Sequence, residues 1–165
     1  GAFNDITTIA TVLSDRRARA RLVARNAGVV AGLALAIEAF HQLDPKASIR
    51  VDAEDGTRVA RGDTVLFLSG HARGLLSAER VALNFLQRLS GVASLTGRYV
   101  DAVKGTRARI LDTRKTTPGW RALEKYAARK SKMSCTLTAP EQLKSPAQAV
   151  PMWKIANFDA GWPPA

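Results

Sequence analysis

The most constraining feature of this sequence is a long amphipathic stretch, residues 75–103. Apolar side chains recur there at steps of three and four residues, which is the period of a helix with one buried face. Over residues 75–90 these side chains are Leu75, Ala78, Ala82, Phe85, Leu86 and Leu89. We expect Gly91 to interrupt the helix, a second helix to follow over 92–103, and Lys104-Gly105 to end it with a glycine cap. The apolar face predicts packing against a sheet of short strands.

The first strand of that sheet is predicted over residues 17–25, where arginine alternates with small or apolar residues. A period of two indicates a strand with one buried face. We expect inward positions at Ala18, Ala20, Leu22 and Ala24, and outward positions at Arg17, Arg19, Arg21, Val23 and Arg25. Four arginines on one strand face are compatible with a nucleic-acid stripe. A solvated face that discourages edge pairing is the favoured interpretation.

Turn and strand signals divide the stretch between these two elements. Residues 31–43 are rich in helix formers, and Asp44-Pro45 ends that helix. Short strands are predicted over 48–53 and 58–60, and a buried strand over 64–69. The order of a strand, a helix and three short strands favours an α+β sandwich over alternating βαβ units.

A cluster of cations and hydroxyls follows the long helix, in residues 107–126. Ile110 and Leu111 end a predicted strand, polar residues 112–117 lie at its carboxyl end, and Pro118-Gly119 precedes a helix-like run. Within this cluster Arg114 offers a planar fork for a carboxylate, and Lys115 offers a compact point charge. The pattern fits an anion site, and on spacing alone it fits a solvated turn equally well.

Composition limits the classes of partner. The formal net charge of +11 fits nucleic acid, an anionic membrane surface or small anionic substrates, so the charge does not separate them. Aromatic residues make up only 6%, which makes nucleic acid the less favoured partner. No apolar run approaches the roughly 20 residues of a membrane span, so we expect no membrane association and a cytoplasmic location. The single Cys135 excludes an intrachain disulfide.

Three stretches carry a family resemblance: ERVALNFLQRLSGVASLTGRYV, LDTRKTTPG and LEKYA. Together they resemble nicotinate-nucleotide pyrophosphorylase, also called quinolinate phosphoribosyltransferase. The family pairs an N-terminal sandwich domain with a barrel, and it makes nicotinate mononucleotide for NAD biosynthesis from quinolinate and phosphoribosyl pyrophosphate, usually with Mg²⁺. The resemblance implies that Arg114 and Lys115 bind substrate, that Arg80 reaches the substrate pocket of a neighbouring subunit, and that the chain forms a homodimer or higher oligomer.

The resemblance ends near Ala127, where the composition also changes. Residues 1–127 hold 16 arginines and 4 lysines, whereas residues 128–165 hold 1 arginine and 4 lysines. We therefore expect a sandwich domain over 1–105, the first barrel strand and anion motif over 106–127, and an unrelated, irregular, proline-rich tail over 128–165. Residues 139–143 and 150–158 are predicted to form short packed pieces of that tail.

The family's later glycine-rich turn, Asn-His-Arg triplet and acidic ribose and metal ligands have no counterpart in the tail. We therefore expect a truncated relative with impaired or no phosphoribosyl transfer. Two alternatives stay open: a different, simpler reaction in the same cationic pocket, and a non-catalytic dimerising scaffold or anion- or nucleic-acid-binding module.

Overall fold

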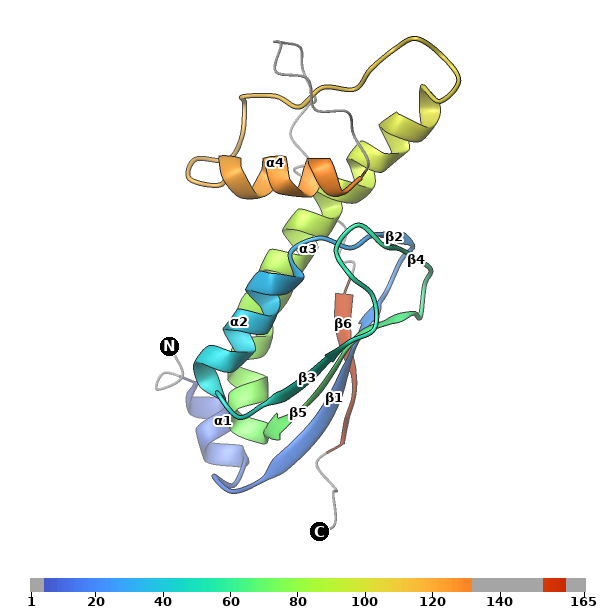
Figure 1. The fold of residues 1–165 in the computed structure, drawn as a ribbon. Helices are drawn as coiled ribbons and strands as arrows, with labels where there is room; N and C mark the ends of the chain where they lie inside the picture. The colour runs from blue at the N-terminus through green and yellow to red at the C-terminus, as the bar shows by residue number, and fades with distance from the viewer. Residues whose placement is uncertain (1–4, 132–152, 160–165) are drawn as a thin grey trace.

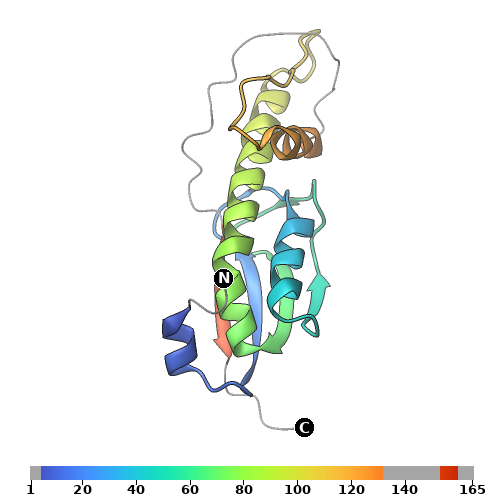
Figure 2. The same cartoon turned by 90° about the vertical axis from the view of Figure 1, so that its left-hand side faces the viewer.

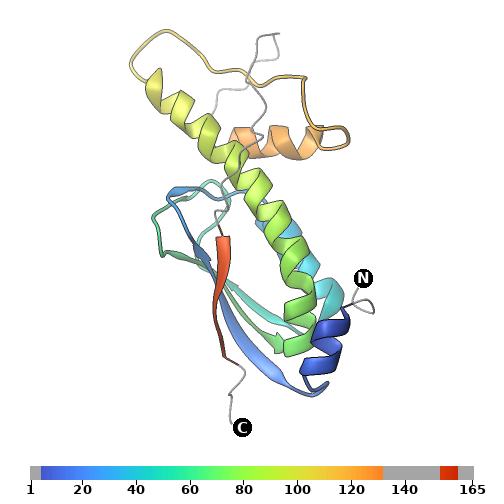
Figure 3. The same ribbon diagram turned by 180° about the vertical axis from the view of Figure 1, so that it is seen from behind.

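Helices and strands are segregated in the fold, as the predicted α+β class requires (Figure 1). The computed structural model describes residues 5–131 and 153–159. In chain order the elements are α1 (Ile6–Thr11), β1 (Arg17–Ala24), β2 (Gly28–Val29), α2 (Leu33–Leu43), β3 (Ser48–Val51), β4 (Arg58–Val59), β5 (Thr64–His71), α3 (Ala72–Ala102), α4 (Arg121–Lys130) and β6 (Trp153–Asp159). Four strands form an antiparallel sheet in the order β3-β5-β1-β6, and β2 pairs with β4. Helices α2 and α3 cover one face of the larger sheet (Figures 2 and 3).

Strand β1 confirms the predicted alternation in its first part and departs from it at Val23. Ala18 and Ala20 are buried and Arg19 is exposed, as expected. Val23 was predicted to point outward, but it is only 6% exposed. The pairing of β1 with β5 shifts register between Leu22 and Val23, and such a β-bulge re-aims the side chains that follow it.

Helix α3 is one continuous helix of 31 residues, so the predicted break at Gly91 is wrong. A glycine inside a helix costs about 1 kcal/mol relative to alanine, and tertiary hydrogen bonds flank this one. The Ser90 hydroxyl accepts the Ala31 N–H at 2.9 Å, and the Ser94 hydroxyl accepts the Val29 N–H at 2.7 Å. The two serines hold α3 against β2 and the residues that follow it, which offsets the local cost.

Helix α2 begins at Leu33, two residues later than predicted, because Gly32 has a left-handed backbone with φ 99°. A Cβ atom at this position would lie 2.8 Å from Cδ1 of Leu89 on α3, so glycine also permits the close approach of the two helices. The Asp55 carboxylate accepts the N–H groups of Gly32 and Leu33 at 3.0 and 3.1 Å. It accepts the Tyr126 hydroxyl of α4 as well, at 2.6 Å.

The turn after α2 is tied to the junction of β5 and α3 by Asp44. This carboxylate is buried, accepts the His71 backbone N–H at 2.7 Å, and lies 3.3 Å from the His71 ring Nδ1. His41 lies in the last turn of α2.

Residues 107–120 run as an irregular connection from α3 to α4, so the predicted first barrel strand does not form here. A strand is held by pairing with a neighbour, and no strand in the described ranges pairs with residues 107–111. The helix-like run after Pro118-Gly119 is confirmed as α4, which crosses α3 (Figure 1).

The tail is less irregular than predicted. Its first residues, Ala128, Arg129 and Lys130, complete α4. Strand β6 falls on the packed piece predicted over 150–158 and pairs antiparallel with β1, whose edge offers unpaired backbone groups. The other predicted piece, 139–143, lies outside the described residues. Within residues 5–131 and 153–159, no helix combines the length and the apolar character that a bilayer crossing needs.

Candidate functional site

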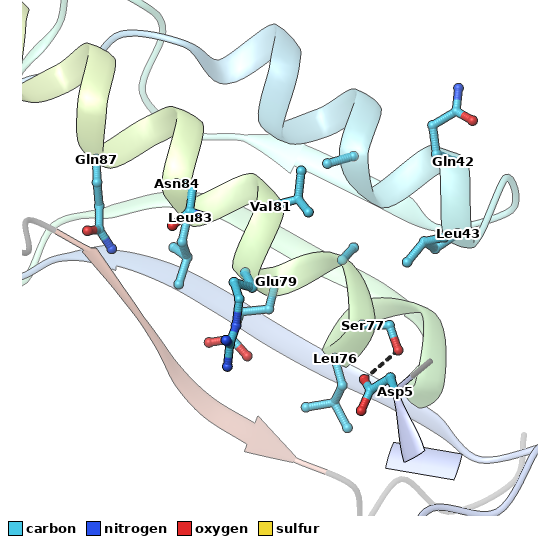
Figure 4. A pocket seen from close by; sticks show the side chains of 13 residues that line it. Asp5, Gln42, Leu43, Leu76, Ser77, Glu79, Val81, Leu83, Asn84 and Gln87 are labelled. Carbon is cyan, nitrogen blue, oxygen red and sulfur yellow. Dashed lines mark hydrogen bonds between the residues drawn. The ribbon is translucent and has the colours of Figure 1, made fainter. Parts of the chain in front are cut away.

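Arg80 lies on α3. Together with Asn84 and Gln87, one and two turns further on, it lines a pocket of about 730 Å³ beside α2 (Figure 4). Asp5 closes one end of the pocket, where its carboxylate accepts the Ser77 hydroxyl at 2.7 Å.

Two carboxyl groups lie near Arg80 and differ in their environment. Hydrogen bonds from Ser77 and Thr8 lower the pKa of Asp5, and the charge of Arg80 adds to this effect. Burial raises the pKa of Glu79, although Arg80 opposes the shift. Arg80 therefore acts on one carboxyl group whose pKa is lowered and on one whose pKa is raised.

Arg114 and Lys115 are exposed side by side on the connection between α3 and α4. Local hydrogen bonds shape the turn that carries them: the Lys115 N–H donates to the Thr113 hydroxyl at 3.0 Å, and the Thr116 N–H donates to the Arg114 carbonyl at 3.1 Å. We call residues 112–120 the cation loop. The structure brings Arg114 and Lys115 together on this loop, whereas Arg80 lines the separate α2–α3 pocket.

A partly buried ion pair between α3 and α4 holds the cation loop in place. The Arg88 Nη2 atom donates to Oε1 of Glu124 at 2.6 Å and also to the Thr117 hydroxyl. The same hydroxyl donates to Glu124 Oε1 at 2.9 Å. The Glu124 side chain is 10% exposed and the Arg88 side chain 26%, so the two charges compensate each other away from water. We call Arg88, Thr117 and Glu124 the loop clamp.

Two further contacts fix the ends of the cation loop. The Lys125 ammonium pairs with Asp112 at 2.6 Å, and the rings of Phe85 and Trp120 stack with centroids 5.4 Å apart. None of these four residues was predicted to anchor the loop, although Phe85 was expected on the apolar face of the long helix. Glu124 and Lys125 fall in the LEKYA stretch, and that resemblance is the only signal that could have drawn attention to them.

The chemistry that this arrangement supports is binding of an oxyanion. Two cations and the Thr113 and Thr116 hydroxyls lie on one anchored loop, and an Arg fork with a nearby ammonium suits a carboxylate pair. Within the described part of the chain, no three His, Cys, Asp or Glu side chains gather closely enough to hold a metal ion. Asp112 is already paired with Lys125. Mg²⁺ stays an expectation drawn from the resemblance.

Two family models match successive parts of this chain. Residues 5–90 match the family model of the quinolinate phosphoribosyl transferase N-terminal domain, and residues 92–131 match that of its C-terminal domain. The chain is 46% identical over 127 residues to nicotinate-nucleotide pyrophosphorylase [carboxylating] of Mycobacterium leprae, covering 76% of this chain and 45% of the relative. It is 47% identical over 115 residues to a probable nicotinate-nucleotide pyrophosphorylase [carboxylating] of Synechocystis, covering 70% and 39%.

Solved structures give the same relationship. NadC from Streptococcus pyogenes superposes with a TM-score of 0.76 at 42% identity, covering 80% of this chain and 47% of that one. The nicotinate-nucleotide pyrophosphorylase from Francisella tularensis superposes with a TM-score of 0.75 at 35% identity, covering 80% and 46%. The chain thus spans less than half the length of these relatives. With both family models matched in order along it, the chain belongs to the quinolinate phosphoribosyltransferase family.

Proposed function

We propose that this chain supplies the dicarboxylate-binding part of a quinolinate phosphoribosyltransferase, with Arg114 and Lys115 as the binding cations. The observation that carries the proposal is the anchored cation loop, which holds both side chains toward solvent while the loop clamp fixes the backbone behind them. The Arg114 guanidinium can take one carboxylate in a bidentate pair, and the Lys115 ammonium can neutralise the second. The names of the relatives support a pyridine dicarboxylate as the ligand.

Binding by this loop is expected to be weak. Both cations are exposed, and an exposed ion pair contributes only about 0–1 kcal/mol after desolvation and side-chain ordering. A dissociation constant on the order of millimolar corresponds to about −4 kcal/mol, which two carboxylate contacts and the loop hydroxyls can supply. We expect the described residues to bind quinolinate without transferring phosphoribosyl, because they offer no acidic cluster for the sugar or for Mg²⁺.

We also propose that Arg80 acts across an interface between two copies of the chain. It lies on a different part of α3 from the residue that holds the loop: eight residues separate it from Arg88, which is about 12 Å along the axis at 1.5 Å per residue. Its neighbour Val81 is 50% exposed, although it is apolar. A homodimer that covers this face should appear in light scattering as a mass near twice 17.8 kDa. The cytoplasm is the proposed location.

Isothermal calorimetry with quinolinate tests the site at moderate salt. Arg114→Ala should remove most of the measurable binding, whereas Arg61→Ala, which removes the same charge from a distant exposed turn, should change it less than twofold. Equal losses from the two substitutions would show that the field of the basic chain, not the loop, holds the ligand. Unchanged binding by Arg114→Ala would refute the assignment of the loop.

A further inference from the structure

The four-stranded sheet has an outer face opposite α2 and α3 (Figure 3). This face carries its own arrangement of cations. The strand register places Arg21 of β1 opposite Phe67 of β5, and Phe67 opposite Arg50 of β3. Directly opposed residues of antiparallel strands project to the same face. An arginine therefore flanks Phe67 on each side. In the row two residues further along, Arg19 and Ser69 are opposed in the same way.

These rows surround a hollow of about 540 Å³. Its polar and aromatic lining consists of Arg19, Arg21, Arg50, Ser48, Ser69 and Phe67. A smaller hollow of about 50 Å³ adjoins it and shares Arg19 and Ser69, and Arg17 lines its other side. The arginines of β1 therefore extend past the main hollow in one line. Alternate residues of a strand are about 6.7 Å apart at 3.3–3.4 Å per residue.

Arg50 and Phe67 form a flat surface within the hollow. The Arg50 guanidinium lies 4.0 Å from the centre of the Phe67 ring, and its side chain is 67% exposed. Asp52 pairs with Arg50 at 2.9 Å and holds the guanidinium in place over the ring. Arginine planes and aromatic rings are the surfaces on which proteins stack unpaired bases.

Acidic residues flank this face at two of its edges. Asp52 is engaged by Arg50 on one side, and on the other Asp159 of β6 is the register partner of Arg19. A second copy of the chain is a poor occupant, because two faces lined by arginine would repel each other in a protein of net charge +11. A regular polyanion with planar groups fits the face better.

We propose that the outer face of the sheet binds single-stranded nucleic acid, with the β1 arginines on successive phosphates and one base stacked on the Arg50–Phe67 surface. The line of arginines is longer than a mononucleotide site needs, because Arg17 lies beyond the main hollow. This surface is separate from the cation loop, so the proposal does not depend on quinolinate binding.

The test is fluorescence polarisation of a labelled ten-nucleotide oligothymidylate with the whole chain. Three phosphate contacts give a slope of log affinity against log salt of about −2, or a loss of roughly 20-fold between 50 and 200 mM salt. Arg21→Ala should reduce the slope by about 0.7. Arg50→Lys keeps the charge and the pairing with Asp52 but removes the plane, and it should weaken binding roughly fivefold or more.

Arg98→Ala on α3 is the matched control, since it removes one exposed charge far from the sheet, and it should weaken binding less than twofold. Arg114→Ala should likewise leave oligonucleotide binding unchanged, and Arg21→Ala should leave quinolinate binding unchanged. Three results would overturn the proposal: equal losses from Arg98→Ala and Arg21→Ala, equal competition by thymidine monophosphate and by oligothymidylate at the same phosphate concentration, or a self-association that Arg21→Ala abolishes. Each of these results would show that the outer face is not a binding site for single-stranded nucleic acid.

Discussion

Removing Arg88 is the sharpest test of how the cation loop is held. Arg88→Met keeps most of the side-chain volume but leaves the Glu124 carboxylate, 10% exposed, with the Thr117 hydroxyl as its remaining donor in the loop clamp. Breaking a fully buried ion pair costs about 3–5 kcal/mol. Because Arg88 is 26% exposed, water can partly replace it, and we expect a loss of about 2–3 kcal/mol. For a chain of this length, that loss lowers the melting temperature by roughly 4–12 °C.

Urea denaturation followed by far-ultraviolet circular dichroism measures this loss. Arg98→Met, on the same helix but exposed, serves as the control and should change the free energy of unfolding by less than about 0.5 kcal/mol. The double variant Arg88→Met/Glu124→Gln should recover at least half of the loss, because it removes the uncompensated charge. A loss below about 0.5 kcal/mol for Arg88→Met, or no recovery in the double variant, would refute the loop clamp as the support of the loop.

Other contacts predict effects that the same denaturation experiment can check. Burial raises the pKa of Asp44, but hydrogen bonds from His71 outweigh it and lower the net pKa below the ordinary 3.8. Asp44→Asn should therefore destabilise the chain above about pH 4. This loss of stability should vanish as the pH falls through the folded-state pKa of Asp44. Burial and a carboxylate partner raise the pKa of Tyr126 to about 12, so its contribution holds below pH 10 and is lost between pH 10 and 12. An absorbance titration that gives an ordinary midpoint for Tyr126 would contradict this. Gly32→Ala should cost about 1–3 kcal/mol more than Gly62→Ala, since both have positive φ but only the first meets a neighbouring side chain.

Local pattern predicted most of the elements because local pattern determines them. Arginine alternating with alanine from Arg17 onward can bury one face only as a strand, and the stripe from Leu75 onward can do so only as a helix. The predictions were wrong where contacts with residues distant in the sequence determine the local structure. Gly91 stays helical because Ser90 and Ser94 bond to a segment about 60 residues away, and Val23 turns inward at a bulge that depends on its partner strand.

The site shows the same division between local and distant determinants. The cations Arg114 and Lys115 were predicted as a pair from their neighbours in the sequence, and both are exposed on one loop. Their role in binding stays a prediction. The residues that support the loop could not be predicted from the sequence. A single buried residue such as Glu124 leaves no periodic signal, and its partner Arg88 is 36 residues away. The predicted strand over residues 107–111 failed for a related reason: strand formation needs a neighbour, which its own sequence does not specify.

The unbroken α3 has a mechanical consequence. A helix of 31 residues is about 46 Å long at 1.5 Å per residue, and it carries Arg80, the sheet contacts and the anchor of the cation loop on one rod. Arg80 and the residues that anchor the loop, Phe85 and Arg88, all precede Gly91 and lie within about two turns of one another on this helix. A tilt imposed near Arg80 would therefore move Arg88, and the loop attached to it, through the same angle. A subunit that docks against Arg80 would thereby change the orientation of Arg114 and Lys115 without contacting either residue.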